Sequence, residues 1–161
     1  MKIDDFICSI PTSLLIYTYM GVDFRQYSCK YFWVADKKYC DVSKFKLEVD
    51  KFNLVSKRQI IKTDKDIYYG YLEYQYAIYP AFTKHELLSM LPKTYEYEGE
   101  TYYKKQEFSD VSNLISYINK RENGSYMWFS ENTEMKALEN AVSHFAKETS
   151  KLLKEADCVG V

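Results

Sequence analysis

The sequence predicts an α+β fold in which antiparallel β-hairpins form a sheet, covered by a C-terminal amphipathic helix and two short helices. Two observations predict it: residues 82–107 join a capped helix to a tyrosine-rich hairpin, and residues 133–156 repeat apolar side chains at helical spacing. A hydrophobic content of 47% with only 5 Gly and 3 Pro excludes a disordered or low-complexity chain. The length of 161 residues suits one domain, which we expect to span residues 1–161.

The N-terminal part of the chain predicts a short helix followed by a strand. Pro11 stands in the expected first turn of the helix, where proline is tolerated. Gly21 stands just past its expected end, where glycine is common. The side chains of this helix expected to face inward are Leu14, Leu15 and Thr18. The run YFWVA at residues 31–35 is apolar, aromatic and of strand length.

The next segment is basic, although the whole chain carries a net charge of only −1. Residues 37–65 hold nine Lys or Arg against four Asp or Glu, with aromatic residues between them, a composition that could neutralise phosphates and stack bases. The cations that would contact a nucleic acid are Lys57, Arg58, Lys62 and Lys65. We favour the alternative of a solvated stretch that keeps the protein soluble, because the lysines follow no helical or strand period.

Alternation of large apolar residues with other side chains predicts a half-buried strand at residues 72–78, which Pro80 should end. The chain has 17 tyrosines, and tyrosine suits half-exposed strands and contact surfaces because it combines a large apolar ring with a polar hydroxyl. Tyr74 on this strand and Tyr102 on the later hairpin are therefore candidates for contacting a partner.

A helix with clear end signals follows. Thr83 and Glu86 have the spacing of a capping box, Phe82 and Leu87 that of a hydrophobic staple, and Pro92 stops the helix.

The next residues predict a hairpin. Glu98 and Gly99 separate two tyrosine-rich runs, and glycine can supply the positive φ of a two-residue loop. Such a loop would place Tyr95 opposite Tyr102 on the neighbouring strand.

Residues 109–121 fit either a helix or a strand. Val111, Leu114, Ile115 and Ile118 have the spacing of one helical face. However, the Asn-Gly pair at residues 123–124 lies between two strand-forming runs, which is a strong hairpin signal. We expect the hairpin.

The C-terminal helix begins at a cap formed by Asn132 or Thr133, with Glu134 placed well for the positive end of the helix. Its apolar stripe consists of Met135, Leu138, Val142, Phe145, Leu152 and Ala156. A single stripe on a helix that follows strands predicts packing on a sheet, and a dimer interface is the alternative.

The sequence contains few residues suited to catalysis. His85 and Glu86 begin a segment like the H-E-x-x-H zinc signature, but Ser89 stands at the second histidine. The chain has no glycine-rich phosphate loop and no nucleophile elbow. The four cysteines lack C-x-x-C spacing, which predicts reduced thiols: they are Cys8, Cys29, Cys40 and Cys158. We expect a non-enzyme without catalytic residues, metal or cofactor.

The motif YPAFTKHELLSMLP at residues 79–92 resembles a segment of small uncharacterised proteins encoded by bacteriophages and integrated mobile elements. These proteins also tend to begin with a short helix and an aromatic strand and to close with a hairpin and an amphipathic helix. The likeness does not extend to residues 37–72, and it favours a strand at residues 114–119. The group has no established activity, so the resemblance implies a context rather than a mechanism.

Small non-enzymatic phage proteins often bind a host protein or a ribonucleoprotein, including RNA-guided defence effectors. We therefore expect an accessory protein of this kind, such as an anti-CRISPR-like inhibitor of host defence, acting in the host cytoplasm as a monomer or homodimer. The apolar run at residues 14–20 is too short to span a membrane, so we expect no membrane contact. RNA binding through residues 37–65 is the first alternative, and an enzyme of unknown class is the second.

Overall fold

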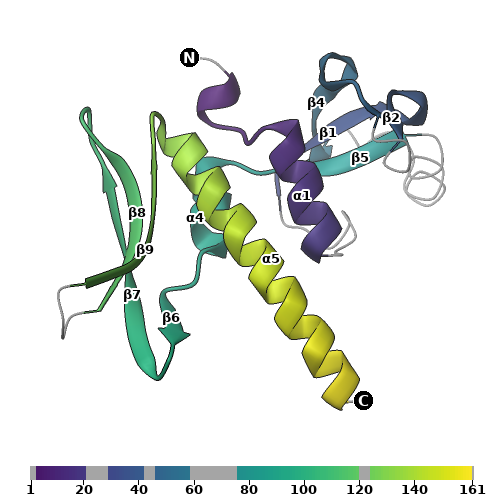
Figure 1. The fold of residues 1–161 in the computed structure, drawn as a ribbon. Coiled ribbons are helices and arrows are strands. Elements are labelled where there is room, and N and C mark those ends of the chain that lie inside the picture. Colours follow the sequence, from purple (N-terminus) through teal and green to yellow (C-terminus); the bar gives the residue numbers. More distant parts are fainter. Residues whose placement is uncertain (1–2, 21–28, 42–45, 59–75, 120–123, 161) are drawn as a thin grey trace. The chain divides into compact units, whose positions relative to one another are not determined.

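The computed structural model describes residues 3–20, 29–41, 46–58, 76–119 and 124–160 (Figure 1). The chain divides into two compact units: an N-terminal unit, Ser9–Thr83, and a C-terminal unit that joins Met1–Cys8 to Lys84–Val161. Antiparallel strands and a C-terminal helix confirm the α+β class. Among the described residues, no helix is long and apolar enough to cross a lipid bilayer.

Over its described residues, the N-terminal unit contains the helix α1, five strands and two 3-10 helices. Three of the strands form an antiparallel sheet in the order β4-β1-β5, and β2 pairs with β3 in a short ladder. The elements are α1 (Ile10–Met20), β1 (Tyr31–Asp36), η3 (Lys37–Tyr39), β2 (Cys40–Asp41), β3 (Lys46–Leu47), η5 (Val49–Lys51), β4 (Asn53–Ser56) and β5 (Tyr76–Ala81).

Helix α1 confirms the predicted N-terminal helix but not every inward-facing residue. Ser13 and Ile16 are fully buried and the predicted Leu14 and Leu15 are half-buried, whereas Thr18 is exposed. The helix is apolar around most of its circumference, so apolar spacing alone does not select its inner face. The Thr18 hydroxyl instead donates to the Leu14 carbonyl oxygen of its own helix (2.7 Å), which satisfies it on the exposed side.

Strand β5 differs from its prediction in two ways. Pro80 does not end the strand but lies within it, opposite Phe32 of β1. This is possible because β5 is an edge strand, where the missing N–H of proline can face away from the sheet. Residues 77–81 are also buried at every position rather than alternately, so both faces of this part of the strand are covered. Leu72 and Tyr74 lie outside the described residues.

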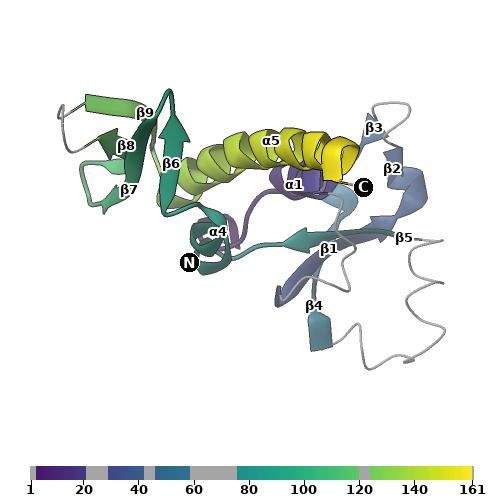
Figure 2. The same ribbon diagram turned by 90° about the horizontal axis from the view of Figure 1, so that it is seen from below.

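The C-terminal unit consists of a four-stranded antiparallel sheet in the order β6-β7-β8-β9 and of helices that pack with it. The long helix α5 lies against one face of this sheet and also contacts α4 (Figures 1 and 2). The elements are η1 (Ile3–Asp5), α4 (Lys84–Met90), β6 (Thr94–Tyr97), β7 (Glu100–Phe108), β8 (Asn113–Asn119), β9 (Gly124–Glu131) and α5 (Glu134–Gly160).

Helix α4 confirms the predicted helix that ends before Pro92. Its neighbours Phe82 and Leu91 and its own Leu87 are buried. The hairpin β6–β7 has the predicted register, with Tyr95 opposite Tyr102. Both loop residues adopt positive φ, 50° at Glu98 and 77° at Gly99, so the turn demands a left-handed conformation of glutamate as well as of glycine.

The alternative left open at residues 109–121 is decided in favour of the hairpin. Strands β8 and β9 pair from Asn113 opposite Glu131 to Asn119 opposite Gly124, with a register shift between Tyr117 and Ile118. The helical alternative is wrong because its first apolar residue, Val111, is 95% exposed in the loop before β8.

Helix α5 confirms the C-terminal amphipathic helix. Thr133 is the cap, since its hydroxyl oxygen accepts the Lys136 N–H (3.1 Å). Within the part of the stripe whose side chains are described, every predicted residue is buried: Met135, Leu138, Val142 and Phe145. This part of the stripe packs inside its own unit, so it is not a dimer interface. The side chains of Leu152 and Ala156 lie outside the described residues.

Replacing Leu138 with alanine tests this packing. Leu138 is almost completely buried on α5, so its truncation should lower the free energy of unfolding by about 2–5 kcal/mol. Urea denaturation followed by circular dichroism measures the change. Lys136→Ala, at an exposed position of the same helix, is the matched control and should stay within about 0.5 kcal/mol of wild type. Equal stabilities of the two variants would contradict the packing.

Candidate functional site

The four-stranded sheet has one face covered by α5. Aromatic side chains from β6, β8 and β9 surround Phe145 of that helix, with ring centroids 5.6 Å away at Tyr95, 5.1 Å at Tyr117 and 6.5 Å at Phe129. Successive residues of a strand point to opposite faces, and directly paired residues share a face. These contacts therefore assign every paired residue of the sheet to one face or the other.

The opposite face, which we call the outer face, carries the alternate residues of β7, β8 and β9. Three rows of paired residues cross it, and no described element of this unit covers them (Figure 1). The rows are Tyr103–Ile118, Lys105–Ser116–Trp128 and Glu107–Leu114–Ser130.

The outer face is dominated by two exposed aromatic rings. Trp128 is 63% exposed and Tyr103 is 43% exposed. Ser116, between Lys105 and Trp128 in the middle row, is only 5% exposed. Tryptophan and tyrosine on a rigid sheet bring a large apolar area together with a hydrogen-bonding group, the combination most common at the energetic centre of protein interfaces.

The two charges in these three rows compensate each other, and the exposed Glu96 of β6 lies outside the rows. Lys105 and Glu107 form an ion pair (Nζ to Oε1, 3.1 Å), with both side chains about half exposed. Such a surface pair contributes little to stability, but it leaves the face close to neutral around the aromatic residues. A neutral face with exposed rings suits contact with another protein better than contact with a phosphate backbone.

The sequence-predicted contact residues do not lie on the outer face. Tyr102 pairs with Tyr95, whose ring contacts Phe145, so Tyr102 belongs to the covered face and is half-buried. Lys57 and Arg58 directly follow β4 in the N-terminal unit, where Lys57 is half-buried and Arg58 exposed. Lys62, Lys65 and Tyr74 lie outside the described residues.

The two described aromatic residues of the basic segment, Tyr39 and Phe52, are engaged by their own unit. Phe52 is buried, and Tyr39 has the ammonium groups of Lys38 and Lys51 at 5.0 and 5.5 Å from its ring centroid. Cations in these positions stabilise the ring electrostatically and occupy space that a stacked base would need. The described part of this segment therefore has exposed charged groups, but its described aromatic rings are not available for stacking with a base.

The two histidines have different surroundings. His85 is exposed on α4, and the Ser89 hydroxyl one turn later donates to the Glu86 carbonyl oxygen (2.7 Å). His144 packs its ring against Phe129 at 5.7 Å and Phe145 at 5.3 Å. Over the described ranges, no three His, Cys, Asp or Glu side chains are grouped to hold a metal ion.

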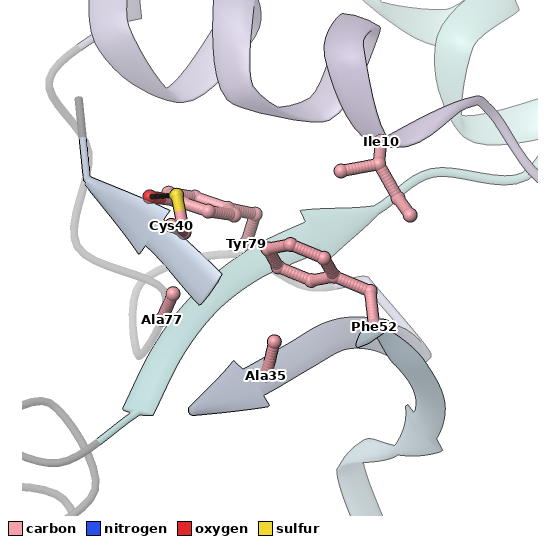
Figure 3. Close-up of a cluster of buried hydrophobic side chains, with 6 residues drawn as sticks. All are labelled: Ile10, Ala35, Cys40, Phe52, Ala77 and Tyr79. Carbon is pink, nitrogen blue, oxygen red and sulfur yellow. Dashed lines mark hydrogen bonds between the residues drawn. The ribbon is translucent and has the colours of Figure 1, made fainter. Parts of the chain in front are cut away.

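The cysteines with described side chains are core residues. Cys8, Cys29 and Cys40 are buried and take part in no disulfide, while Cys158 lies outside the described side chains. Figure 3 shows the Cys40 thiol facing the Tyr79 hydroxyl at 3.3 Å, with the apolar residues Ile10 and Phe52 in the same cluster. Burial raises the pKa of Tyr79, and the hydrogen bond with Cys40 adds to the rise. This pair is a polar contact within a hydrophobic core.

Comparison of this chain with protein-family models, with curated proteins and with solved structures finds no match. The resemblance to phage-encoded proteins stays a prediction, and the outer face is the candidate site on its own geometry. The sequence contained one usable signal for it, the run YMWF in β9, because alternation must put Trp128 on one face and its two neighbours on the other.

Alkaline pH tests the aromatic cluster under α5. Burial raises the pKa of Tyr117, whose hydroxyl donates to the Pro92 carbonyl oxygen (2.6 Å). The unfolded chain releases this proton near pH 10, whereas the folded chain retains it, so the contribution of Tyr117 is fully present below about pH 10 and is lost as pH rises further. Tyr117→Phe should therefore flatten the decline of unfolding free energy between pH 9 and 11.

Thr18→Val is the control for this experiment. It also removes a hydroxyl that donates to a backbone carbonyl, but it removes no group that titrates near pH 10. Urea denaturation at a series of pH values compares the slopes. A Tyr117→Phe protein with the same alkaline slope as wild type would contradict the assignment.

Proposed function

We propose that this chain is a protein-binding protein that acts through the outer face of its four-stranded sheet. The observation that carries the proposal is Trp128, which is 63% exposed in the middle row of a face without a described cover. In the context that the sequence resemblance implies, the partner is a host protein or a ribonucleoprotein, and binding inhibits a host defence.

The geometry supports binding energetically because the backbone that carries the two rings is already held in paired strands. A side chain held on a paired strand loses less conformational freedom on binding than one on a loop. Burial of a tryptophan at the centre of an interface commonly contributes 2 kcal/mol or more, about a thirtyfold change in affinity. Lys105 and Glu107 would supply the polar rim around that centre.

Nucleic-acid binding is the alternative that the experiment must separate. Of the predicted contact cations, the exposed Arg58 is the described residue best placed for it. Phosphate contacts make the affinity fall as the salt concentration rises. Each contact adds about 0.7 for single strands, or about 0.9 for duplex, to the downward slope of log K against log salt concentration. Contact through a near-neutral aromatic face predicts a much weaker dependence on salt.

The first experiment measures capture from a bacterial host lysate by the immobilised full chain, with and without nuclease. Wild type should retain the same partner after nuclease treatment, and Trp128→Ala should lower the affinity for that isolated partner about thirtyfold. Tyr19→Ala is the matched control, since Tyr19 is a 40% exposed ring on α1 of the other unit. The control should leave the affinity unchanged, and circular dichroism should show all three proteins folded.

The second experiment titrates salt against binding to random single-stranded and duplex RNA and DNA. The variant replaces four cations by glutamine: Lys57, Arg58, Lys62 and Lys65. We expect wild type to bind none of these nucleic acids at about 50 mM salt. Tight binding that loses its salt slope in the glutamine variant, together with capture that nuclease abolishes, would replace the protein-binding proposal by the nucleic-acid alternative.

A further inference from the structure

Strand β9 ends the four-stranded sheet and leaves an open edge. No described strand pairs with β9 on the side away from β8. Its sequence is GSYMWFSE, in which Glu131 at the end is the only charged residue and no proline occurs. An edge of this kind presents unpaired backbone N–H and C=O groups that can pair with another strand.

The other edges of the two larger sheets are protected. Strand β6 is four residues long and carries Glu96. Strand β4 is also four residues long and is followed by Lys57 and Arg58, while β5 contains Pro80. Short length, charge and proline are the devices that prevent strand addition. Strand β9, with eight residues, uses none of them over residues 124–130.

The hydrogen-bond alternation identifies which groups point to the open edge. The Ser109 N–H donates to the Ser112 carbonyl oxygen (2.8 Å), so these residues form a hydrogen-bonded pair at the end of the β7–β8 hairpin. In an antiparallel ladder, hydrogen-bonded pairs alternate with non-hydrogen-bonded pairs. The backbone N–H and C=O of Ile115, three residues after Ser112, therefore point away from β7 and toward Phe129, its partner in β9. The residues of β9 whose backbone N–H and C=O therefore point outward are Trp128 and Ser130.

We propose that a second copy of this chain occupies the edge, pairing antiparallel along β9 with Trp128 opposite Ser130 of the second copy. In this register the large indole lies beside a small serine, and Phe129 meets its own counterpart at the two-fold axis. Met127 falls opposite Glu131 of the second copy, so no like charges meet. The edge is thus complementary to itself, which makes a second copy a better occupant than an unrelated strand.

The neighbouring register shifted toward the N-terminal end of β9 is less favourable. It would centre the axis on Trp128 and set the two indole rings directly opposite each other. It would also place Ser130 opposite Tyr126, the residue that the register shift leaves without a partner in β8. A bulged residue disrupts regular pairing, so the register centred on Phe129 keeps the regular part of both strands.

Dimerisation at this edge joins the two four-stranded sheets. It uses the backbone of Trp128 but leaves its side chain on the outer face, so the two outer faces become continuous with a Trp128 on each side of the axis. The inference rests on the edge of β9 and does not depend on the proposed function. It would give a partner two equivalent contact sites.

The mass of the full chain in solution tests the proposal. Analytical ultracentrifugation should find twice 19.2 kDa, falling toward 19.2 kDa on dilution. Ser130→Pro removes an outward N–H that β8 does not use, so this variant should stay folded and become monomeric. Ser130→Ala keeps the backbone donor and should remain dimeric. A wild-type chain that is monomeric at every concentration overturns the proposal, as does a folded Ser130→Pro dimer.

Disulfide trapping tests the register without relying on the proline variant. In a Cys158→Ser background, Trp128→Cys and Ser130→Cys are made as separate proteins and oxidised with diamide. Cα atoms of a hydrogen-bonded pair lie about 5.5 Å apart, within disulfide range, whereas residues two positions out of register lie at about 7–8 Å. An equal mixture should form covalent dimers and neither variant alone should. Cross-linking of single variants without cross-linking of the mixture contradicts the register.

Discussion

The packing of Phe145 against Tyr117 is the contact on which the C-terminal unit depends. The two rings meet edge to face at 5.1 Å, and both side chains are buried. Because side chains alternate along a strand, seating Tyr117 under α5 fixes the face of every residue paired with β8. A slip of one residue would bring Ser116 under the helix and expose Tyr117. The same contact that builds the core therefore also decides that Trp128 faces outward.

A second interaction ties this core to the preceding segment. The Tyr117 hydroxyl reaches the Pro92 carbonyl oxygen, at the point where α4 has ended and β6 is about to begin. An ion pair between Lys84 at the start of α4 and Glu134 at the start of α5 (3.1 Å) joins the two helices at their N-termini. Helix, hairpin and C-terminal helix thus form one packed unit, and the exposed rings of the outer face stand on a rigid support.

Much of this architecture could be predicted because its signals are local. The spacing of Thr83 and Glu86, the two-residue loop at Glu98 and Gly99, and the stripe of α5 each depend on a few neighbouring residues. The prediction for Pro80 was wrong because it assumed an interior position, whereas tertiary pairing places the proline on an edge strand. Thr18 was misplaced because an apolar helix gives no single inner face.

The candidate site was harder to predict than the fold. Alternation divides YMWF between two faces, but only the contact with Phe145 shows which face is covered. The register shift at Tyr117 and Ile118 adds one residue to β9, and composition cannot reveal such a shift. Charge counting instead directed attention to residues 37–65, where Phe52 is buried and Tyr39 lies close to two lysines. Whether an aromatic ring is exposed depends on which other elements pack over it, and that packing exists only in the folded chain.

The central claim, that Trp128 stands exposed on an ordered outer face, has a direct spectroscopic test. The chain has two tryptophans, so a Trp33→Phe variant reports on Trp128 alone. Its emission should be red-shifted and efficiently quenched by acrylamide in the native state, while time-resolved anisotropy should show the ring rotating with the whole protein rather than independently. Blue-shifted emission that resists quenching in the dilute, monomeric protein would contradict the exposed face and the account built on it.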